Sequence, residues 1–214
     1  MAGWDTAGDG SDRFTAFLID NAGGWQCAEL QKDLSEPAYA RQLYCLGRYY
    51  NGALLAVEIN FSTYVELKLE EWAYPNLYRR KRFDKKAAKL MDANGWRTDK
   101  STRPVALANL WSVMDEVPEL VRSKWTLGEM MVFARNEHDR PEAMAGEHDD
   151  LVTAAAICHL AREQGRQTAD ERPEEKREKL LVQLAHRKRR TMLWTRKQPR
   201  PACRTSEPLF LRLR

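Results

Sequence analysis

Apolar and polar residues alternate along the first part of the chain with the period of two that is typical of β-strands. A short β-prone segment at 1–5 enters a turn rich in Gly, Asp and Ser, and an alternating strand follows at 13–20. A tight turn at 20–24 then leads into a third strand at 25–30. Because both connections are short, the pattern predicts an antiparallel three-stranded meander.

The pattern next changes to helical spacing and then returns to a strand. Ser-Glu-Pro at 35–37 is typical of a helix start, and Asn-Gly at 51–52 is typical of a helix end. Residues 53–60 form a nearly continuous apolar run. A run of this length between two helices indicates a buried strand of a parallel pair, and we expect the second of these helices at 61–72.

The second half of the chain is predicted to be mainly helical. Residues 77–83 read as a short basic edge strand, and a helix is expected at 104–117. Thr126 is expected to cap a further helix, and an alanine-rich helix is expected within 146–158. The sulfur and aromatic side chains of the helix after Thr126 are assigned to the core: Met130, Met131 and Phe133.

These elements define an α/β fold with a central mixed five-stranded sheet, made of the meander plus two parallel strands and flanked by helices. The chain has 214 residues, enough for one domain with an appendage. Residues 1–170 carry 21 Lys and Arg against 26 Asp and Glu, whereas residues 171–214 carry 14 against 5. We therefore expect a domain at 1–165 and a basic, partly disordered tail at 166–214 with a charged helix at 173–190.

Such a basic tail suits nucleic acid or an acidic protein partner, and a solubilising terminus is the alternative. Nothing in the sequence resembles a signal peptide, and no apolar stretch is long enough to span a bilayer. The four cysteines form no CxxC pair and no zinc pattern. We expect a cytoplasmic protein that does not use a membrane.

Acidic residues stand at three places where the predicted elements begin or end. Asp5 ends the first strand, Glu58 lies inside the apolar run, and Asp149 and Asp150 begin the late helix. Each has a structural alternative: a solvated turn for Asp5, a salt bridge for Glu58, and helix capping for the Asp pair. However, two neighbouring strands and an overlying helix can bring these carboxylates within a few ångströms.

Carboxylates that close repel one another unless a divalent cation neutralises them. Oxygen-only ligands suit Mg²⁺ or Mn²⁺, and two such ions about 4 Å apart are the device that hydrolyses phosphodiesters. The pattern therefore predicts a nuclease site. Near the start of the helix at 104–117, Lys100 and Arg103 can hold phosphate, and ordinary surface charge is the alternative.

Three segments, GWDTAGDGSDRFT, AVEIN and GEHDDLVTAAAI, together resemble the acidic motifs of the nuclease domain of viral (phage-type) terminase large subunits. The likeness covers roughly residues 1–163 in order, including GW-x-T at 95–98 and the helix at 127–133. It implies an RNase H-like fold related to RuvC resolvases. It also implies that Asp5, Glu58 and Asp149 are catalytic metal ligands, with Asp150 as an alternative or additional ligand. Asp12 matches a further acidic position.

In that family the domain cuts concatemeric viral DNA during genome packaging. The resemblance therefore implies double-stranded DNA as substrate, two Mg²⁺ or Mn²⁺ ions, and work in the host cytoplasm. It also implies an ATPase motor, small terminase and portal proteins as partners. The sequence contains no GxxxxGK[ST] motif, so we expect no ATP hydrolysis by this chain. A RuvC-like resolvase or transposase-type nuclease, and a non-catalytic DNA-binding packaging module, are the alternatives.

Overall fold

The structure of the chain is a computed structural model. It describes residues 2–5, 13–84, 89–135, 141–144, 146–170 and 212–213, with side chains at 13–81, 89–134, 141–144 and 146–165.

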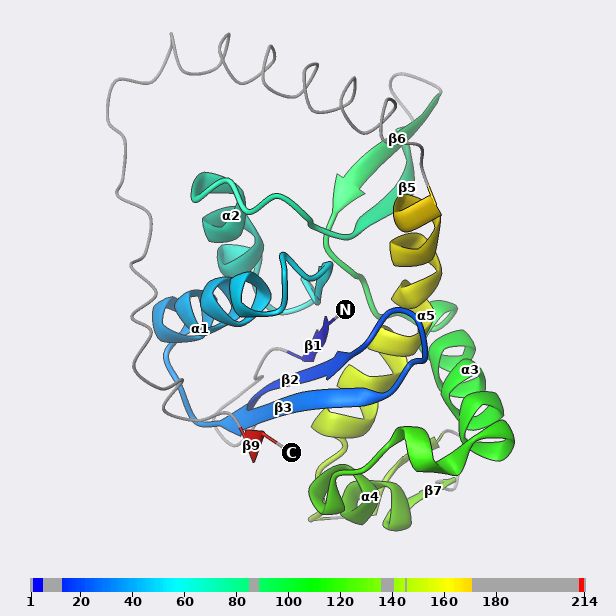
Figure 1. Ribbon diagram of the computed structural model, residues 1–214. Helices are drawn as coiled ribbons and strands as arrows, with labels where there is room; N and C mark the ends of the chain where they lie inside the picture. Colours follow the sequence, from blue (N-terminus) through cyan, green and yellow to red (C-terminus); the bar gives the residue numbers. More distant parts are fainter. Residues whose placement is uncertain are drawn as a thin grey trace, which may run out of the picture.

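A single mixed sheet forms the centre of the molecule (Figure 1). Its strand order is β4-β1-β2-β3-β9. The five strands are β1 (Ala2–Asp5), β2 (Phe14–Ile19), β3 (Gln26–Lys32), β4 (Leu55–Val57) and β9 (Arg212–Leu213). The first three pair antiparallel, as the turns predict, and β4 pairs parallel to β1. The predicted meander and its parallel neighbour are therefore both present.

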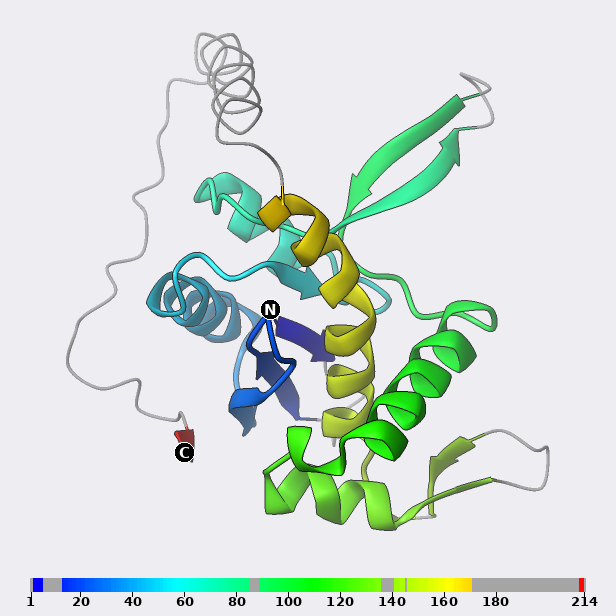
Figure 2. The same cartoon turned by 45° about the vertical axis from the view of Figure 1, so that its right-hand side comes forward.

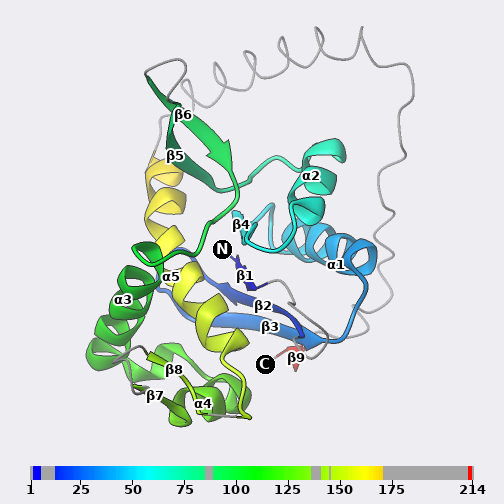
Figure 3. The same cartoon turned by 180° about the vertical axis from the view of Figure 1, so that it is seen from behind.

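Helices cover both faces of this sheet, and Figure 3 shows the same layers from behind. The helical segments are α1 (Glu36–Tyr49), α2 (Tyr64–Glu71), α3 (Thr102–Glu116), the short 3-10 helix η1 (Pro118–Leu120), α4 (Lys124–Met131) and α5 (Asp150–Asp170). Strand β2 is buried along its whole length, and its pleat divides it between two cores. Phe17 and Ile19 pack against α3 and α5, whereas Ala16 and Leu18 pack against α1 and α2.

Helix α5 lies directly on the sheet because its inward face is built from small residues. Ala154, Ala155 and Ala161 are at most 1% exposed and belong to the core shared with α3. Alanine lets a helix axis approach a sheet more closely than a branched side chain does, at no cost in helix propensity. The alanine-rich helix that the sequence predicts is therefore the element that joins the sheet to the helices on this face.

The second parallel strand of the predicted sheet is not present as a strand among the described residues. Beside β4 the chain makes only single parallel bridges, Leu55 with Leu77 and Glu58 with Trp96. The fifth strand is instead β9, which pairs antiparallel with β3. The apolar run at 53–60 indicated a strand of a parallel pair. Only Leu55–Val57 of this run forms a strand, and its partner in the sheet is β1.

The basic segment at 77–83 is also not an edge strand of the central sheet. It forms most of β5 (Arg79–Asp84), which pairs with β6 (Lys89–Asn94) in a separate hairpin that projects from the body (Figure 2). A second small hairpin joins β7 (Phe133–Arg135) to β8 (Pro141–Ala143). Both hairpins lack the continuous apolar face that would bury them against the sheet.

The start of α4 differs from the prediction as well. Ser123 caps the helix, with its hydroxyl accepting from the Trp125 backbone N–H, whereas Thr126 is a buried residue of the first turn. Met131 is 85% exposed and does not belong to the core. Met130 and Phe133 are partly buried against the core, as predicted.

No helix among the described residues is long and apolar enough to cross a membrane. Helix α5 continues to Asp170, five residues beyond the predicted domain boundary at 165. The predicted helix at 173–190 and most of the tail lie outside the described residues. The division of the chain into a domain at 1–165 and a tail at 166–214 stays a prediction.

Candidate metal centre

The predicted acidic residues of the sheet stand side by side at one edge of it. Asp5 pairs with Thr15 across the antiparallel ladder of β1 and β2. On the other side Trp4 pairs with Val57, so the parallel register brings Glu58 beside Asp5. The backbone thus places Asp5 between Glu58 and Thr15. The side chain of Asp5 lies outside the described residues.

Glu58 is a buried carboxylate whose surroundings do not satisfy it. Its residue is 2% exposed, and its Oε2 atom has no hydrogen-bond partner among the described residues. Burying a charged oxygen without a donor costs more free energy than burying a neutral polar atom, for which the cost is about 1–3 kcal/mol. A structural salt bridge, the alternative from the sequence, does not form at Glu58 among the described residues.

The Gly-Trp pair at 95–96 fixes the backbone of Glu58. The Trp96 N–H donates to Val57 O at 2.6 Å, and the Ile59 N–H donates to Trp96 O at 2.9 Å. Gly95 has φ of 78°, and a Cβ there would clash with Ile59. Glycine is therefore required at this close approach of two backbones.

The N-terminus of α5 meets the same edge of the sheet from above. The Thr15 hydroxyl donates to the backbone oxygen of Asp150 at 3.4 Å, and Thr15 is the ladder partner of Asp5. Asp150 is the first residue of the helix and is 7% exposed. Asp149 precedes it, and its carbonyl accepts the Thr153 N–H at 2.8 Å. The structure therefore brings Glu58, the backbone of Asp5 and the Asp pair to one end of the sheet.

Asp149 carries a partner that the sequence does not predict. The Arg103 guanidinium of α3 donates to Asp149 Oδ2 at 2.7 Å, and the two side chains are 37% and 22% exposed. Arg103 also donates to Pro141 O at 3.5 Å. The sequence offers phosphate binding or surface charge as the role of Arg103. The structure adds a third possibility, an ion pair with Asp149 at the site.

Glu129 of α4 is a functional candidate that the sequence reasoning missed. Its carboxylate accepts from the N–H groups of Leu151 at 2.7 Å and Val152 at 3.3 Å, and from Gln31 Nε2 at 2.8 Å. The pKa of Glu129 is raised to about 7, mainly because burial outweighs the three donors that lower it, and the charge of Asp150 adds to the rise. Glu129 thus caps the helix that presents the Asp pair. The only signal in the sequence is that it is the one acidic residue within Trp125–Phe133.

The carboxylates fit a hard divalent cation better than any other ligand. The set is oxygen-only, it is partly buried, and Glu58 offers an oxygen that no donor of the described part of the chain occupies. Among the described side chains, which exclude that of Asp5, no group of three or more His, Cys, Asp or Glu is placed to hold a metal ion. Glu58, Asp149 and Asp150 therefore do not form a metal site by themselves among the described residues, and the proposed site includes Asp5. Asp12, the further acidic position of the resemblance, lies outside the described residues.

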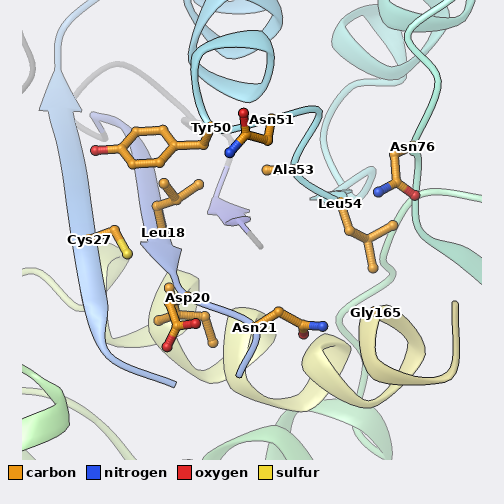
Figure 4. A pocket seen from close by; sticks show the side chains of 11 residues that line it. Leu18, Asp20, Asn21, Cys27, Tyr50, Asn51, Ala53, Leu54, Asn76 and Gly165 are labelled. Carbon is orange, nitrogen blue, oxygen red and sulfur yellow. The ribbon is translucent and has the colours of Figure 1, made fainter. Parts of the chain in front are cut away.

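A cavity of about 300 Å³ opens at the opposite end of β2. Its lining includes Leu18, Asp20, Tyr50, Asn51 and Asn76 (Figure 4). The Asp20 carboxylate there accepts backbone N–H groups of its own turn. The cavity contains none of the predicted metal ligands, so it is separate from the acidic edge of the sheet.

The sheet order, the helix layers and the acidic edge together define the fold of a phage large terminase nuclease, an RNase H-like fold. The structure of the large terminase nuclease from thermophilic phage G20c with bound magnesium superposes with a TM-score of 0.56. The match covers 74% of this chain and 79% of that one at 17% sequence identity.

Two further structures of the same phage nuclease give the same result. The form with bound cobalt matches with a TM-score of 0.55 at 16% identity, covering 74% of this chain and 79% of that one. A third structure matches with a TM-score of 0.56 at 16% identity, covering 74% and 80%. No protein-family profile matches the sequence, and no curated protein matches it. The likeness thus establishes the fold and confirms the resemblance that the three motifs carry.

Proposed function

We propose that this chain is a metal-dependent DNA endonuclease of the terminase large subunit type, which cuts concatemeric viral DNA during genome packaging. The observation that carries the proposal is Glu58, a buried carboxylate with an oxygen that no described residue hydrogen-bonds, beside Asp5 at the edge of the sheet that α5 overlies. A protein retains such an unfavourable group where a ligand compensates it. The magnesium and cobalt in the phage structures support a divalent ion as that ligand.

Asp5, Glu58, Asp149 and Asp150 are the residues that would hold the metal. Two Mg²⁺ or Mn²⁺ ions bound there would activate the attacking water and stabilise the leaving oxygen of the phosphodiester. The chain itself supplies the rigidity. Glu58 is fixed by the Trp96 bridge, and the Asp pair is fixed by the Glu129 cap on α5. We expect 5′-phosphate and 3′-hydroxyl ends, by resemblance to the family.

The β5–β6 hairpin offers a path for the DNA backbone. Arg79, Lys81 and Lys89 are exposed on it. Arg80 joins the hairpin base to the site, because its guanidinium donates to Asn94 O at 2.6 Å and to Gly95 O at 3.1 Å. Exposed Lys and Arg side chains bind phosphates without reading base sequence. We infer that double-stranded DNA lies along this hairpin.

In its biological setting we infer that the chain works with an ATPase motor, a small terminase and a portal protein in the cytoplasm of the host. These partners follow from the resemblance alone. The lack of a GxxxxGK[ST] motif makes ATP hydrolysis by this chain unexpected.

The proposal is tested by incubating supercoiled plasmid with the purified chain and Mg²⁺ or Mn²⁺, with EDTA as the metal-free control. Wild type should nick and linearise the plasmid, while Asp5→Asn and Glu58→Gln should not. Glu29→Gln is the matched control, because Glu29 is a buried carboxylate of the same sheet that lies on β3, two strands from β1, and accepts from Gln26, Ser123 and Thr126. The folded Glu29→Gln variant should still cleave the plasmid. DNA ligase should reseal the ends that the cleavage leaves.

Cutting that survives in both site variants would show that other residues hydrolyse the DNA. DNA binding without cutting by the wild type would favour the non-catalytic packaging module instead. A marked preference for four-way junctions over linear duplex would favour the RuvC-like resolvase.

A further inference from the structure

Arg103 occupies a position in which a guanidinium competes with a metal ion. Its Nη2 atom lies 2.7 Å from Asp149 Oδ2, and Asp149 is a proposed metal ligand. A divalent cation bound through the same oxygen would stand within a few ångströms of the guanidinium, and like charges at that distance repel. Binding of the guanidinium and binding of a metal ion to Asp149 therefore weaken each other, unless a further negative charge is present at the site.

A loop with several internal hydrogen bonds fixes the position of Arg103. Asp99 Oδ1 accepts the N–H groups of Ser101 at 2.8 Å and Thr102 at 3.0 Å, and Asp99 O accepts the Arg103 N–H at 3.1 Å. These donors hold the pKa of Asp99 at about 2, with the Ser101 hydroxyl making the largest contribution. The start of α3, and with it Arg103, is thereby held in one conformation.

The same loop is tied to the strand that carries Glu58. Asn60 accepts the Thr98 N–H at 3.0 Å and donates its amide to Thr98 O at 2.5 Å, and Trp96 bridges Glu58. Hydrogen bonds therefore connect the loop that precedes Arg103 to the chain segment that contains Glu58. The guanidinium approaches the site from α3, whereas Asp149 approaches from α5.

The natural third party is a phosphate of the DNA backbone. A guanidinium presents several N–H donors in a planar fork that matches phosphate oxygens, and Arg103 is 37% exposed, so solvent and ligand can reach it. A bound phosphate would supply the negative charge that compensates the repulsion between the guanidinium and the metal ion. It also offers the arginine a partner in place of Asp149.

We infer that Arg103 is a gating residue of the proposed nuclease site: it holds Asp149 in the absence of DNA and transfers to a DNA phosphate when substrate binds. This inference rests on the proposed function. Its consequence is that metal binding and DNA binding are coupled, because each removes an obstacle to the other. Metal loading is therefore weak until DNA is present.

The test compares wild type with Arg103→Gln in two binding measurements that need no catalysis. Mn²⁺ binding to the DNA-free protein is followed by isothermal titration calorimetry, and binding of a labelled duplex is followed by fluorescence anisotropy in Ca²⁺. Arg162→Gln is the matched control. Arg162 lies on α5 and donates to Asn21 O at 3.0 Å. Its substitution therefore removes a structural arginine that lies away from the acidic edge of the sheet.

Arg103→Gln should bind Mn²⁺ about tenfold more tightly than wild type without DNA. The same variant should bind the duplex several-fold more weakly, and the slope of log affinity against log salt should fall by about one. Arg162→Gln should change neither quantity. Unchanged or weaker Mn²⁺ binding by Arg103→Gln would overturn the inference, because a purely structural arginine predicts that result.

The failure of the proposed function gives a different pattern. If neither wild type nor Arg103→Gln binds Mn²⁺, the metal centre itself is wrong and the gating role falls with it. If both bind Mn²⁺ equally well, the metal centre stands and only the role of Arg103 is refuted. Mn²⁺ binding by Arg103→Gln alone would support the inference most strongly.

Discussion

Two buried glutamates of the central sheet should respond in opposite ways to the same conservative substitution. Glu58 is 2% exposed, and within the described part of the chain its Oε2 atom has no hydrogen-bond partner. Glu29 is 4% exposed, but it accepts from the hydroxyls of Ser123 at 2.5 Å and Thr126 at 2.9 Å, and from Gln26 at 3.2 Å. The first carboxylate is an energetic liability in the metal-free protein, whereas the second stabilises it.

Glu58→Gln removes the charge while keeping the shape of the side chain. A buried neutral group without a partner costs about 1–3 kcal/mol and a charged one costs more, so the metal-free variant, which has an amide in place of the charge, should be more stable than wild type by the difference, on the order of 1 kcal/mol. For a chain of this size the melting temperature should rise by about 2–4 °C per kcal/mol. Glu29→Gln replaces hydrogen bonds to a charged acceptor by weaker ones, so it should lose about 1.5–3 kcal/mol.

The assay is thermal unfolding by circular dichroism, with urea unfolding to give free energies, first in EDTA and then in Mn²⁺. Wild type should gain stability with Mn²⁺ by about 2.7 kcal/mol at one hundred times the dissociation constant. Glu58→Gln should gain little, and Glu29→Gln should gain as much as wild type. If Glu58→Gln destabilises the metal-free protein as Glu29→Gln does, Glu58 is a satisfied structural residue and the reasoning fails.

Three further substitutions test the packing and the titration of the fold. Burial lowers the pKa of His159 to about 4, so the folded state excludes a proton that the unfolded chain accepts below about pH 6.5. Wild type should therefore lose about 2 kcal/mol between about pH 7 and about pH 5 in urea unfolding, and His159→Leu should lose less. Leu110→Ala, at a fully buried position, should cost about 2–5 kcal/mol in the same assay; a cost below 1 kcal/mol would contradict the packing of α3. Gly47→Ala would press a methyl group against Tyr74 and should lower stability by about 1–3 kcal/mol; an unchanged melting temperature would refute that contact.

The parts of the fold that the sequence predicts are those in which one local rule determines the structure. Alternation and tight turns determine the meander, and β1–β3 follow it within two residues. Glu58 was identifiable because an acidic residue inside an apolar run contradicts its surroundings. The likeness to phage terminase nucleases was visible in the order of the motifs, although this chain shares only 16–17% identity with the matched structures.

The features that the sequence misses depend on which elements meet in space. Segment 77–83 has strand propensity, but whether it joins the main sheet depends on its partner, and β6 pairs with it instead. Glu129 and Arg103 act across distances of 22 and 46 residues, on Leu151 and Asp149. No local pattern encodes such contacts, because each is fixed only when α3, α4 and α5 have packed.

The central claim is that carboxylates from β1, β4 and α5 converge on one divalent metal centre. Its most direct test is the anomalous diffraction of crystals of the chain soaked in Mn²⁺. We predict strong anomalous peaks within about 2.0–2.3 Å of carboxylate oxygens of Asp5, Glu58 and the Asp149–Asp150 pair, with two peaks about 4 Å apart when DNA is present. Manganese bound elsewhere, or no anomalous peak at this edge of the sheet at saturating Mn²⁺, would contradict the account.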